Sequence, residues 1–397
     1  MDFSLSDDQR LLKDTIRQFM EAEVRPHLRQ YEKEGHFPAE EVRKLGELGC
    51  CGMTVPEEWG GTGSDTLSYV VVLEEVARVC ASTAVTLSVN NSVVGAPLAR
   101  HGSAEQKQDM LTRLARGEWL GAFCLTEPQA GSDSAAIATH AVRTGDSYRL
   151  TGTKSWVTNG GMASVYLVFA KTDPSAGAHG TTAFLVTPDL PGFRVARFED
   201  KMGLNISKTA EIRLEECGVP AANRLGEEGQ GLKIALEALD GGRVGIAAQG
   251  VGIAQGAFDA SVRYAKQRRA FGKTLGEFQA IQWMLADMQT EIEAARMLTY
   301  AAACAQDDGK RRGLSPLEAR VGPVASRAKL YASEMVNRVV YKAVQIHGSM
   351  GYSRETEVER MYRDARVISI YEGTSEIQRT VIARDLLGAA PHGEENL

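Results

Sequence analysis

The chain has 397 residues, of which 43% are hydrophobic and 24% charged, and its net charge is −6. This composition is typical of a globular protein that is long enough for two or three domains. The mild negative charge argues against nucleic acid or anionic lipid as a partner, because both need a concentrated positive field. No apolar run approaches the ~20 residues of a membrane-spanning helix.

Residues 1–120 are predicted to form an N-terminal helical domain. Ser6, Asp7 and Asp8 precede an amphipathic run, which indicates a helix start. The stretch "SYVVVLEEVARVCASTAVTLSVNNSVV" is long, apolar and free of proline. Ser103 stands three residues before Gln106, in the pattern of a capping box.

Residues 121–232 have the pattern of a middle β domain. Short runs rich in β-branched and aromatic residues recur, among them "SVYLVFAKT", "TTAFLVTPD" and "TAEIRLEE". Turn pairs such as Asn159-Gly160 and Pro191-Gly192 separate them. Five or more short strands at this spacing predict a small β-barrel or sandwich.

Residues 233–397 are predicted to be a C-terminal helical bundle domain. "VGIAAQGVGIAQGAFDASVRYAKQRR" is rich in alanine and glycine, which let helices approach closely, so we expect a buried helix there. "AIQWMLADMQTEIEAARMLTYAAACAQ" has apolar residues near a period of 3.6. The basic run Lys310–Arg312 is predicted to be a solvated loop rather than a binding patch.

The cysteines, the histidines and the N-terminal residues indicate an intracellular protein without a metal site. None of the six cysteines forms a C-x-x-C motif, and the seven histidines lack H-x-x-x-H or H-E-x-x-H spacing. We therefore expect reduced thiols, no metal and a cytoplasmic location. The start "MDFSLSDDQRLLKDTI" lacks the charge and apolar pattern of a signal peptide.

Three short patterns imitate other catalytic motifs and are set aside. "FGKT" lacks the glycine that a phosphate loop needs at position 267, which is glutamine. "HGSMG" has His347 where a nucleophile elbow needs glycine, and "GVGIAQG" misses the dinucleotide spacing by one residue. An ATPase, a serine hydrolase and a simple Rossmann dehydrogenase are thus disfavoured.

Four stretches occur together in an order that is specific. They are "CLTEPQAGSD" at the start of the β domain, "KSWVTNG" within it, "RRAFGK" in the helical domain and "IYEGTSEIQR" near the end. With "QIHGSMGY" and "YRDAR", they resemble the acyl-CoA dehydrogenase family over almost the whole chain. "LDGGRVGIAAQGVGIAQ" and "SVNNS" are most similar to its short-chain, butyryl-CoA-type branch.

The resemblance implies the acyl-CoA dehydrogenase fold: mainly α, with an N-terminal helical domain, a middle β domain and a C-terminal four-helix bundle. It also implies α,β-desaturation of an acyl-CoA thioester to the trans-2-enoyl-CoA. Glu372 would abstract the α-proton, and flavin N5 would take the β-hydride. The Glu372 backbone N–H and a ribityl hydroxyl would bind the thioester oxygen. A carboxylate in such a dry pocket should have a raised pKa.

One branch of the family takes its base from the residue before the arginine of a D-x-x-R motif. Here that motif is "DGGR", Asp240–Arg243, and the residue is Gly242, which cannot act as a base. Glu372 is therefore the single candidate from these motifs.

By resemblance, the cofactor is FAD, and its expected contacts come from the β domain and from the C-terminal helical domain. In the β domain they are Phe123, Cys124, Leu125, Thr126, Ser132, Trp156, Val157 and Thr158, with Trp156 covering the ring face opposite the substrate. In the helical domain they are Thr374, Ser375 and Glu376, and, reaching the FAD of a neighbouring subunit, Arg268, Phe271, Gln279, Gln345, Ile346, His347, Gly348 and Ser349. His347 replaces the usual apolar residue, and we expect it to serve packing.

The expected contacts to the acyl-CoA substrate are Ser132, Ser207, Asp240, Arg243, Gln249, Tyr371 and Gly373. Gln249 matches a glutamine of the short-chain branch, whereas Ile368 departs from the hydroxyl residue of that branch. Short-chain β-oxidation is the first hypothesis for substrate. A branched-chain or medium-chain dehydrogenase, an acyl-CoA oxidase-like enzyme and a non-catalytic helical scaffold are the alternatives. The resemblance also implies a homotetramer, built as a dimer of dimers, and electron-transferring flavoprotein as the electron acceptor.

Overall fold

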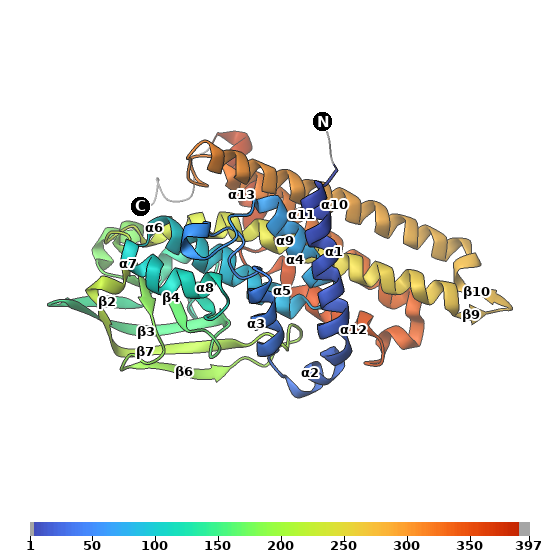
Figure 1. Cartoon of the computed structure of the whole chain (residues 1–397), viewed down its shortest axis with the longest axis horizontal. Helices are drawn as coiled ribbons and strands as arrows, with labels where there is room; N and C mark the ends of the chain where they lie inside the picture. Colours follow the sequence, from blue (N-terminus) through green and yellow to red (C-terminus); the bar gives the residue numbers. More distant parts are fainter. Residues whose placement is uncertain (1–3, 389–397) are drawn as a thin grey trace.

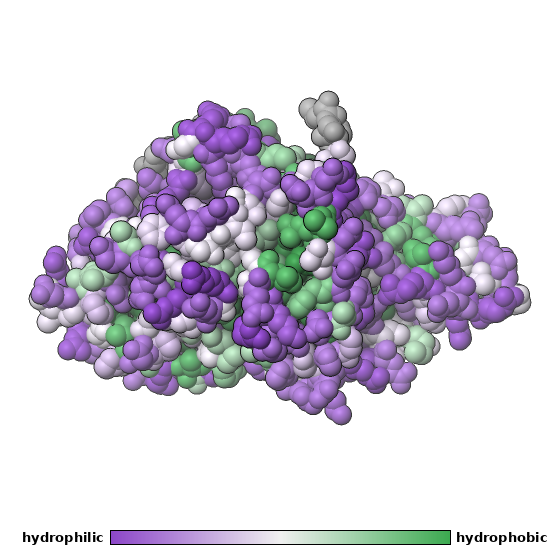
Figure 2. All heavy atoms as spheres, viewed as in Figure 1, coloured by the Kyte–Doolittle hydropathy of each residue, from purple (hydrophilic) through white to green (hydrophobic). Residues whose placement is uncertain are grey.

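The computed structural model describes residues 4–388. Figure 1 shows N-terminal helices in blue at the centre, a β-sheet in green on the left, and long yellow and orange helices that reach the right-hand end. The predicted class, mainly α with a central β domain between two helical parts, is confirmed. The visible face is largely hydrophilic, apart from an apolar area near its centre (Figure 2).

The N-terminal helices begin where the sequence places capping residues. Ser6 Oγ accepts a hydrogen bond from the Gln9 N–H at 3.2 Å, and Gln9 Oε1 accepts one from the Ser6 N–H, so the capping box of α1 is complete. Asp65 caps α4 with a single hydrogen bond, which its side chain accepts from the Ser68 N–H. The helices are α1 (Asp7–Phe19), α2 (Leu28–Glu34), α3 (Ala39–Glu47), α4 (Thr66–Val79), α5 (Ala81–Ser88), α6 (Ala96–His101), α7 (Ala104–Gln106) and α8 (Thr112–Ala115), and a π-helical turn, Val89–Gly95, follows α5.

The middle part is one main sheet, in the order β6-β7-β3-β2-β4-β5-β8, with β1 paired in parallel to β4. Its strands are β1 (Gly121–Cys124), β2 (His140–Thr144), β3 (Ser147–Thr158), β4 (Val165–Lys171), β5 (Thr181–Val186), β6 (Phe193–Phe198), β7 (Thr209–Pro220) and β8 (Arg224–Leu225). The β3–β7 pairing shifts register between Lys154 and Val157, and Trp156 lies within this irregular stretch, where its side chain is exposed. An apolar core with Tyr148, Phe184 and Ile212 lies on one face.

The C-terminal part consists of long helices packed side by side. They are α9 (Gly231–Gln267), α10 (Gln279–Arg311), α11 (Val321–His347), α12 (Glu357–Ala365) and α13 (Ser375–Leu387), and a short hairpin, β9 (Arg269–Ala270) with β10 (Lys273–Thr274), joins α9 to α10. On α9, a β-carbon at Gly252 or Gly256 would come within 2.3 Å of the α4 carbonyl oxygens of Glu74 or Arg78. The expected close packing through small residues is therefore observed.

The loop predicted at Lys310–Arg312 is wrong for its first two residues. Lys310 and Arg311 form the last turn of α10, where positive charge offsets the helix dipole, and Arg312 caps the helix. Lys310 also donates to Thr66 Oγ1 at 3.0 Å.

Across residues 4–388, no helix is both long and apolar enough to span a bilayer. The same residues contain no cluster of three or more side chains suited to a metal ion.

Candidate active site

Glu372 lies in a tight turn between the 3-10 helix Arg366–Ser369 and α13. Its backbone is left-handed, with φ of 50°, and that of Gly373 follows at 87°. A non-glycine residue in this region is uncommon and costs of order 1 kcal/mol, so it persists only where the surroundings hold it. A side chain at Gly373 would collide with Gln378 Nε2 at 2.6 Å. Glycine at 373 is thus required by the turn itself.

Hydrogen bonds hold this turn from both sides. The Tyr371 hydroxyl donates to Gln249 Oε1 on α9. The Gly373 carbonyl accepts from Lys329 Nζ on α11 at 2.6 Å and from Gln378 Nε2 on α13 at 2.9 Å. Three helices therefore hold the turn from which the Glu372 side chain extends.

The Glu372 carboxylate points at the backbone of α9. A β-carbon at Gly242 would lie 2.1 Å from Glu372 Oε2, and Oε2 is shielded from solvent without a hydrogen-bond partner among the described residues. Burial raises the pKa of Glu372 to about 7, although the nearby charges of Lys329 and Arg243 act in the opposite direction. An unpaired carboxylate with a pKa near neutrality is suited to general-base catalysis.

The backbone N–H of Glu372 has no protein acceptor within residues 4–388. A free N–H beside a partly buried carboxylate can donate to an oxygen atom on which negative charge develops. The turn thus combines a proton acceptor with an oxyanion donor, which is the pair needed to remove a proton next to a carbonyl group.

Two predicted substrate residues form an ion pair on the same helix. Arg243 Nη1 donates to Asp240 Oδ1 at 2.5 Å, and both side chains are buried. Burial raises the pKa of Asp240, and Arg243 opposes that shift. The structure therefore brings Asp240, Arg243, Tyr371, Gly373 and Glu372 into one neighbourhood.

Other buried polar side chains near Glu372 are hydrogen-bonded to side chains or to the backbone of α4 and α5. Gln249 Nε2 donates to the Ala81 carbonyl at 2.8 Å, and Tyr69 donates to Ser88 Oγ at 3.3 Å. A β-carbon at Gly245 would approach Ser88 Oγ to 2.7 Å, so α9 lies close against these side chains.

A second group of predicted residues gathers where β1 ends beside the bulge of β3. Trp156 has a left-handed backbone, with φ of 58°, and is 60% exposed, which is unusual for a tryptophan in a sheet. The Ser155 N–H donates to the Thr126 carbonyl at 2.9 Å, so the Thr126 loop and Trp156 are neighbours. Phe123, Leu125 and Thr158 are partly or fully buried around them.

A buried ion pair supports this second group. Lys154 Nζ donates to Glu127 Oε1 at 2.7 Å and to the Leu125 carbonyl at 3.2 Å. Glu127 also accepts from the backbone N–H groups of Ala138 and Thr139. Burial alone would raise the pKa of Glu127, but Lys154 and these N–H groups lower it to about 2.

These residues fit a flavin. An exposed aromatic face at Trp156, hydroxyls at Thr126 and Thr158, and apolar neighbours match a planar ring with polar edges. A separate cleft of about 430 Å³ opens at the start of α13, where an extended polar chain could lie. Its lining includes Ser333, Arg366, Thr374, Ser375 and Glu376, the last three of them predicted cofactor contacts.

The remaining predicted cofactor residues lie at the far end of the bundle. Arg268, Gln279 and Phe271 are exposed beside the β9–β10 hairpin, and Phe271 is 95% exposed. His347 stacks on Tyr264 at 4.3 Å and its Nδ1 lies 2.8 Å from the Ala343 carbonyl, which places the end of α11 at the same end of α9. Arg268, the C-cap of α9, follows Arg243 by 25 residues, or about 37 Å at ~1.5 Å per residue.

Two predicted substrate residues are not brought to Glu372 by any hydrogen bond. Ser132 is exposed in the segment between β1 and β2, and Ser207 is buried in the loop before β7, where Lys201 Nζ donates to its carbonyl at 3.0 Å.

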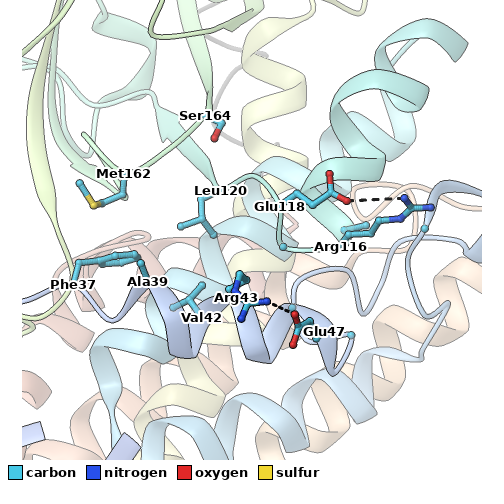
Figure 3. Close-up of a pocket in the computed structure, with 15 residues that line it drawn as sticks. Phe37, Ala39, Val42, Arg43, Glu47, Arg116, Glu118, Leu120, Met162 and Ser164 are labelled. Atoms are coloured by element: carbon cyan, nitrogen blue, oxygen red, sulfur yellow. Dashed lines mark hydrogen bonds and ion pairs between the residues drawn. The ribbon is translucent and has the colours of Figure 1, made fainter. Parts of the chain in front are cut away.

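A shallow groove of about 720 Å³ lies elsewhere, between α3 and the start of the sheet. Figure 3 shows Phe37, Val42, Leu120 and Met162 around it, with the ion pairs Arg43–Glu47 and Arg116–Glu118 nearby. None of the predicted site residues lines this groove.

Sequence reasoning missed four residues that hold the two groups: Lys329, Gln378, Glu127 and Lys154. Lys329 falls on the same helical stripe as the buried Ala325, Ala332 and Val336, and a lysine on an apolar stripe is a detectable signal. Glu127 and Lys154 lie inside the quoted motifs, but only the folded structure, in which Lys154 Nζ lies 2.7 Å from Glu127 Oε1, shows that they meet.

Comparison with known proteins agrees with this geometry. The sequence matches the acyl-CoA dehydrogenase N-terminal domain over residues 6–118, the middle domain over 122–217 and the C-terminal domain over 229–387. A short-chain specific acyl-CoA dehydrogenase from Clostridium acetobutylicum is 44% identical over 383 residues, covering 96% of this chain and 99% of that protein.

Solved structures give the same result. Butyryl-CoA dehydrogenase from Megasphaera elsdenii is 44% identical, with a TM-score of 0.93 over 98% of this chain and 100% of that one. An acyl-CoA dehydrogenase from Bacillus anthracis, complexed with FAD, is 34% identical, with a TM-score of 0.90 over 97% and 68% of the two chains. Since all three domains match in order and relatives align over nearly their full length, this chain belongs to the acyl-CoA dehydrogenase family.

Proposed function

We propose that this acyl-CoA dehydrogenase converts a short-chain acyl-CoA to the trans-2-enoyl-CoA, with Glu372 as the base. The observation that carries the proposal is the Glu372 turn: an unpaired, shielded carboxylate whose pKa is raised to about 7 and a backbone N–H without a protein acceptor. The relatives described as short-chain specific and as butyryl-CoA dehydrogenase support the substrate class.

In this mechanism Glu372 takes the α-proton, and its own N–H donates to the thioester oxygen as charge moves onto that oxygen. The left-handed turn makes both contacts possible from one residue. A substrate filling the pocket would exclude water, which strengthens the N–H contact and raises the basicity of the carboxylate further. Tyr371 and Gln249 would bound the acyl chain on the side away from the thioester.

The cofactor is FAD, which supplies the hydride acceptor when bound. The residues that would hold its ring are Trp156, Phe123, Leu125, Thr126 and Thr158, and Thr374 and Glu376 would hold its polar chain. Lys154 and Glu127 keep the loop that carries Leu125 and Thr126 in place.

We further propose a homotetramer in which the far end of one bundle completes the FAD site of a neighbour. Arg268 caps α9 about 37 Å along the helix from Arg243, too far to share a flavin with Glu372 of the same chain. Phe271 follows in the β9–β10 hairpin, and Gln279 begins α10 after it. Phe271, Tyr352, Trp283 and Tyr341 expose large aromatic surfaces on this domain, as expected of residues covered by another copy.

Electron-transferring flavoprotein is the proposed acceptor, since no motif for a nicotinamide site was found. The competing acyl-CoA oxidase function predicts rapid peroxide formation by the reduced enzyme–product complex, at rates comparable to turnover with a dye. Slow reaction with oxygen supports the dehydrogenase. The cytoplasmic location and a role in β-oxidation stay predictions.

The test is turnover of butyryl-CoA with a dye acceptor, with the enoyl product identified by mass spectrometry. Glu372→Gln should keep the fold and FAD but lose several orders of magnitude in turnover, because no other group in the turn can take the proton. Glu355→Gln, an exposed acid elsewhere in the same domain, is the matched control and should be unaffected. If Glu372→Gln retained more than about a tenth of the activity, the assignment of the base would be wrong.

A further inference from the structure

Lys329 on α11 is a fully buried lysine without a carboxylate within salt-bridge distance among the described residues. It is 0% exposed and lies on the apolar stripe of α11 with Ala325 and Ala332. Lysine is almost never fully buried unless it is paired, because the ammonium group loses its hydration. A residue kept there at such a cost needs a reason beyond packing.

The ammonium group reaches the turn that carries Glu372. Lys329 Nζ donates to the Gly373 carbonyl at 2.6 Å, and Gln378 Nε2 donates to the same oxygen at 2.9 Å. Gln378 Nε2 also lies 3.2 Å from the Glu372 carbonyl. Two donors from two helices thus stabilise the left-handed pair Glu372–Gly373.

Hydrogen bonding alone does not require a charged residue at 329. Gln378 already shows that a neutral amide can hold this carbonyl, and a neutral donor would avoid the desolvation of a cation. The charge of Lys329 should therefore act on another group, and the shielded, unpaired Glu372 carboxylate is its neighbour.

The other titratable groups around Glu372 do not replace this charge. On α9, Arg243 is bound to Asp240, which offsets its charge, and on α4 Tyr69 is a buried phenol. Tyr371, beside the base, is a phenol whose pKa is raised well above its ordinary value by burial, and Glu376 on α13 adds a negative charge. Among residues 4–388, Lys329 is thus the cation near Glu372 that has no carboxylate bound to it.

We propose that Lys329 is a positioning residue for the proposed reaction: it fixes the Gly373 carbonyl so that the turn presents Glu372 to substrate, and its positive charge favours the ionised, reactive form of Glu372. This rests on the proposed function of Glu372 as the base. Burial lowers the pKa of Lys329 to about 8 while Glu372 raises it, so the ammonium form is present at neutral pH.

The first test is the pH profile of kcat/KM on butyryl-CoA. Wild-type activity should rise with pH through about 7, as Glu372 loses its proton. In Lys329→Met and Lys329→Gln the rise should move upward by roughly one pH unit, since both lose the charge and Gln keeps a donor. Lys329→Arg keeps the charge and should restore the wild-type midpoint.

Ser326→Ala is the control for a buried polar side chain lost from the same helix. It should leave the midpoint unchanged. A purely structural role for Lys329 would lower activity without moving the profile. The proposal is overturned if the midpoint in Lys329→Met and Lys329→Gln stays within about 0.2 units of wild type, or moves down.

A second readout needs no turnover. The pKa of Glu372 is about 7 in the fold and ~4.3 when unfolded, so its contribution to stability is complete below ~4.3 and is lost as pH rises to about 7. The Tm difference between proteins with Glu372 and with Glu372→Gln, followed from about pH 5 to about pH 9, reports this window.

In the Lys329→Met background, the contribution of Glu372 to stability should persist to higher pH before it is lost. The proposal is overturned if the pH range of this loss is the same as in wild type. If the protein did not turn over acyl-CoA, the pH dependence of Tm would still test the effect of Lys329 on Glu372. Failure of the proposed function and failure of the Lys329 proposal are therefore distinguishable.

Discussion

Gly242 on α9 leaves the space that the Glu372 carboxylate occupies: a β-carbon at 242 would lie 2.1 Å from Glu372 Oε2 and 3.0 Å from Val93 Cγ1. Glycine at this position is therefore part of the site, although it carries no side chain. The "DGGR" motif thus offers no alternative to Glu372 as the proposed base, and it also makes room for the Glu372 carboxylate.

Gly242→Ala should displace the Glu372 carboxylate and lower kcat by roughly 100-fold, because a shift of ~1 Å at a reacting group can have that effect. FAD absorbance and Tm should stay near wild type, since the flexible end of Glu372 can move. Steady-state kinetics with butyryl-CoA measures the change.

Gly241→Ala is the matched control one residue earlier. A β-carbon there would meet only Gln306 Nε2, at 3.5 Å, which is ordinary contact. If Gly241→Ala and Gly242→Ala lost activity equally, the effect would belong to the helix and not to the space for Glu372.

Much of the fold could be predicted because local signals and packing agree. The capping boxes at Ser6 and Ser103 begin helices as expected, and the small residues of α9 do face α4. These features depend on neighbours in sequence or on one repeating face. The residue types and their spacing in the sequence therefore predict these helix starts and this packing directly.

The parts that could not be predicted depend on contacts between distant segments. Lys329 meets Gly373 across 44 residues, and Glu127 meets Lys154 across 27. The left-handed backbones of Glu372 and Trp156 oppose local preference and are held by tertiary contacts. The family resemblance named Glu372 and Trp156 but not the residues that position them.

Lys154→Met should weaken flavin binding by destabilising the loop of Leu125 and Thr126. Removing one partner of a buried ion pair costs about 3–5 kcal/mol, and it also leaves the Leu125 carbonyl without its lysine donor. We expect a lower Tm and a raised dissociation constant for FAD, measured by flavin fluorescence during titration of the apoprotein.

Lys171→Met tests whether any buried lysine of the sheet has this effect. Lys171 on β4 is buried and donates to the Gly177 carbonyl, in another part of the sheet. It should lower Tm without raising the dissociation constant for FAD. Equal loss of FAD in both variants would contradict a specific role for Lys154.

Arg268→Ala should release FAD and shift the protein from tetramers toward smaller species. Its guanidinium is exposed in the chain and suits a pyrophosphate, so cofactor binding and assembly should be linked. Light scattering at several protein concentrations, with and without added FAD, measures both. A wild-type monomer that holds FAD tightly would rule out the shared site.

We expect the acyl pocket to end at Gln249, a glutamine whose amide is held at both ends. Gln249 is 0% exposed, donates to the Ala81 carbonyl at 2.8 Å and accepts from the Tyr371 hydroxyl. Ile368 is also fully buried and would contact a β-carbon at Gly250. Because Tyr371 precedes Glu372, moving Gln249 to admit a longer chain would also disturb the turn that holds the proposed base, Glu372.

We therefore predict the highest kcat/KM on straight chains of about four to six carbons. Displacing Gln249 would leave two buried polar groups unpaired, at ~1–3 kcal/mol each, whereas each extra methylene gains only ~0.8 kcal/mol.

Gln249→Ala should move the optimum to longer chains. Gln255→Ala, on the same helix but bonded to Asp259 and Arg296, should leave it unchanged. Measuring kcat/KM from C4 to C16, with isobutyryl-CoA and 2-methylbutyryl-CoA, decides the matter. A wild-type optimum at C8 or longer, or on a branched chain, would show that Gln249 does not set the depth of the pocket.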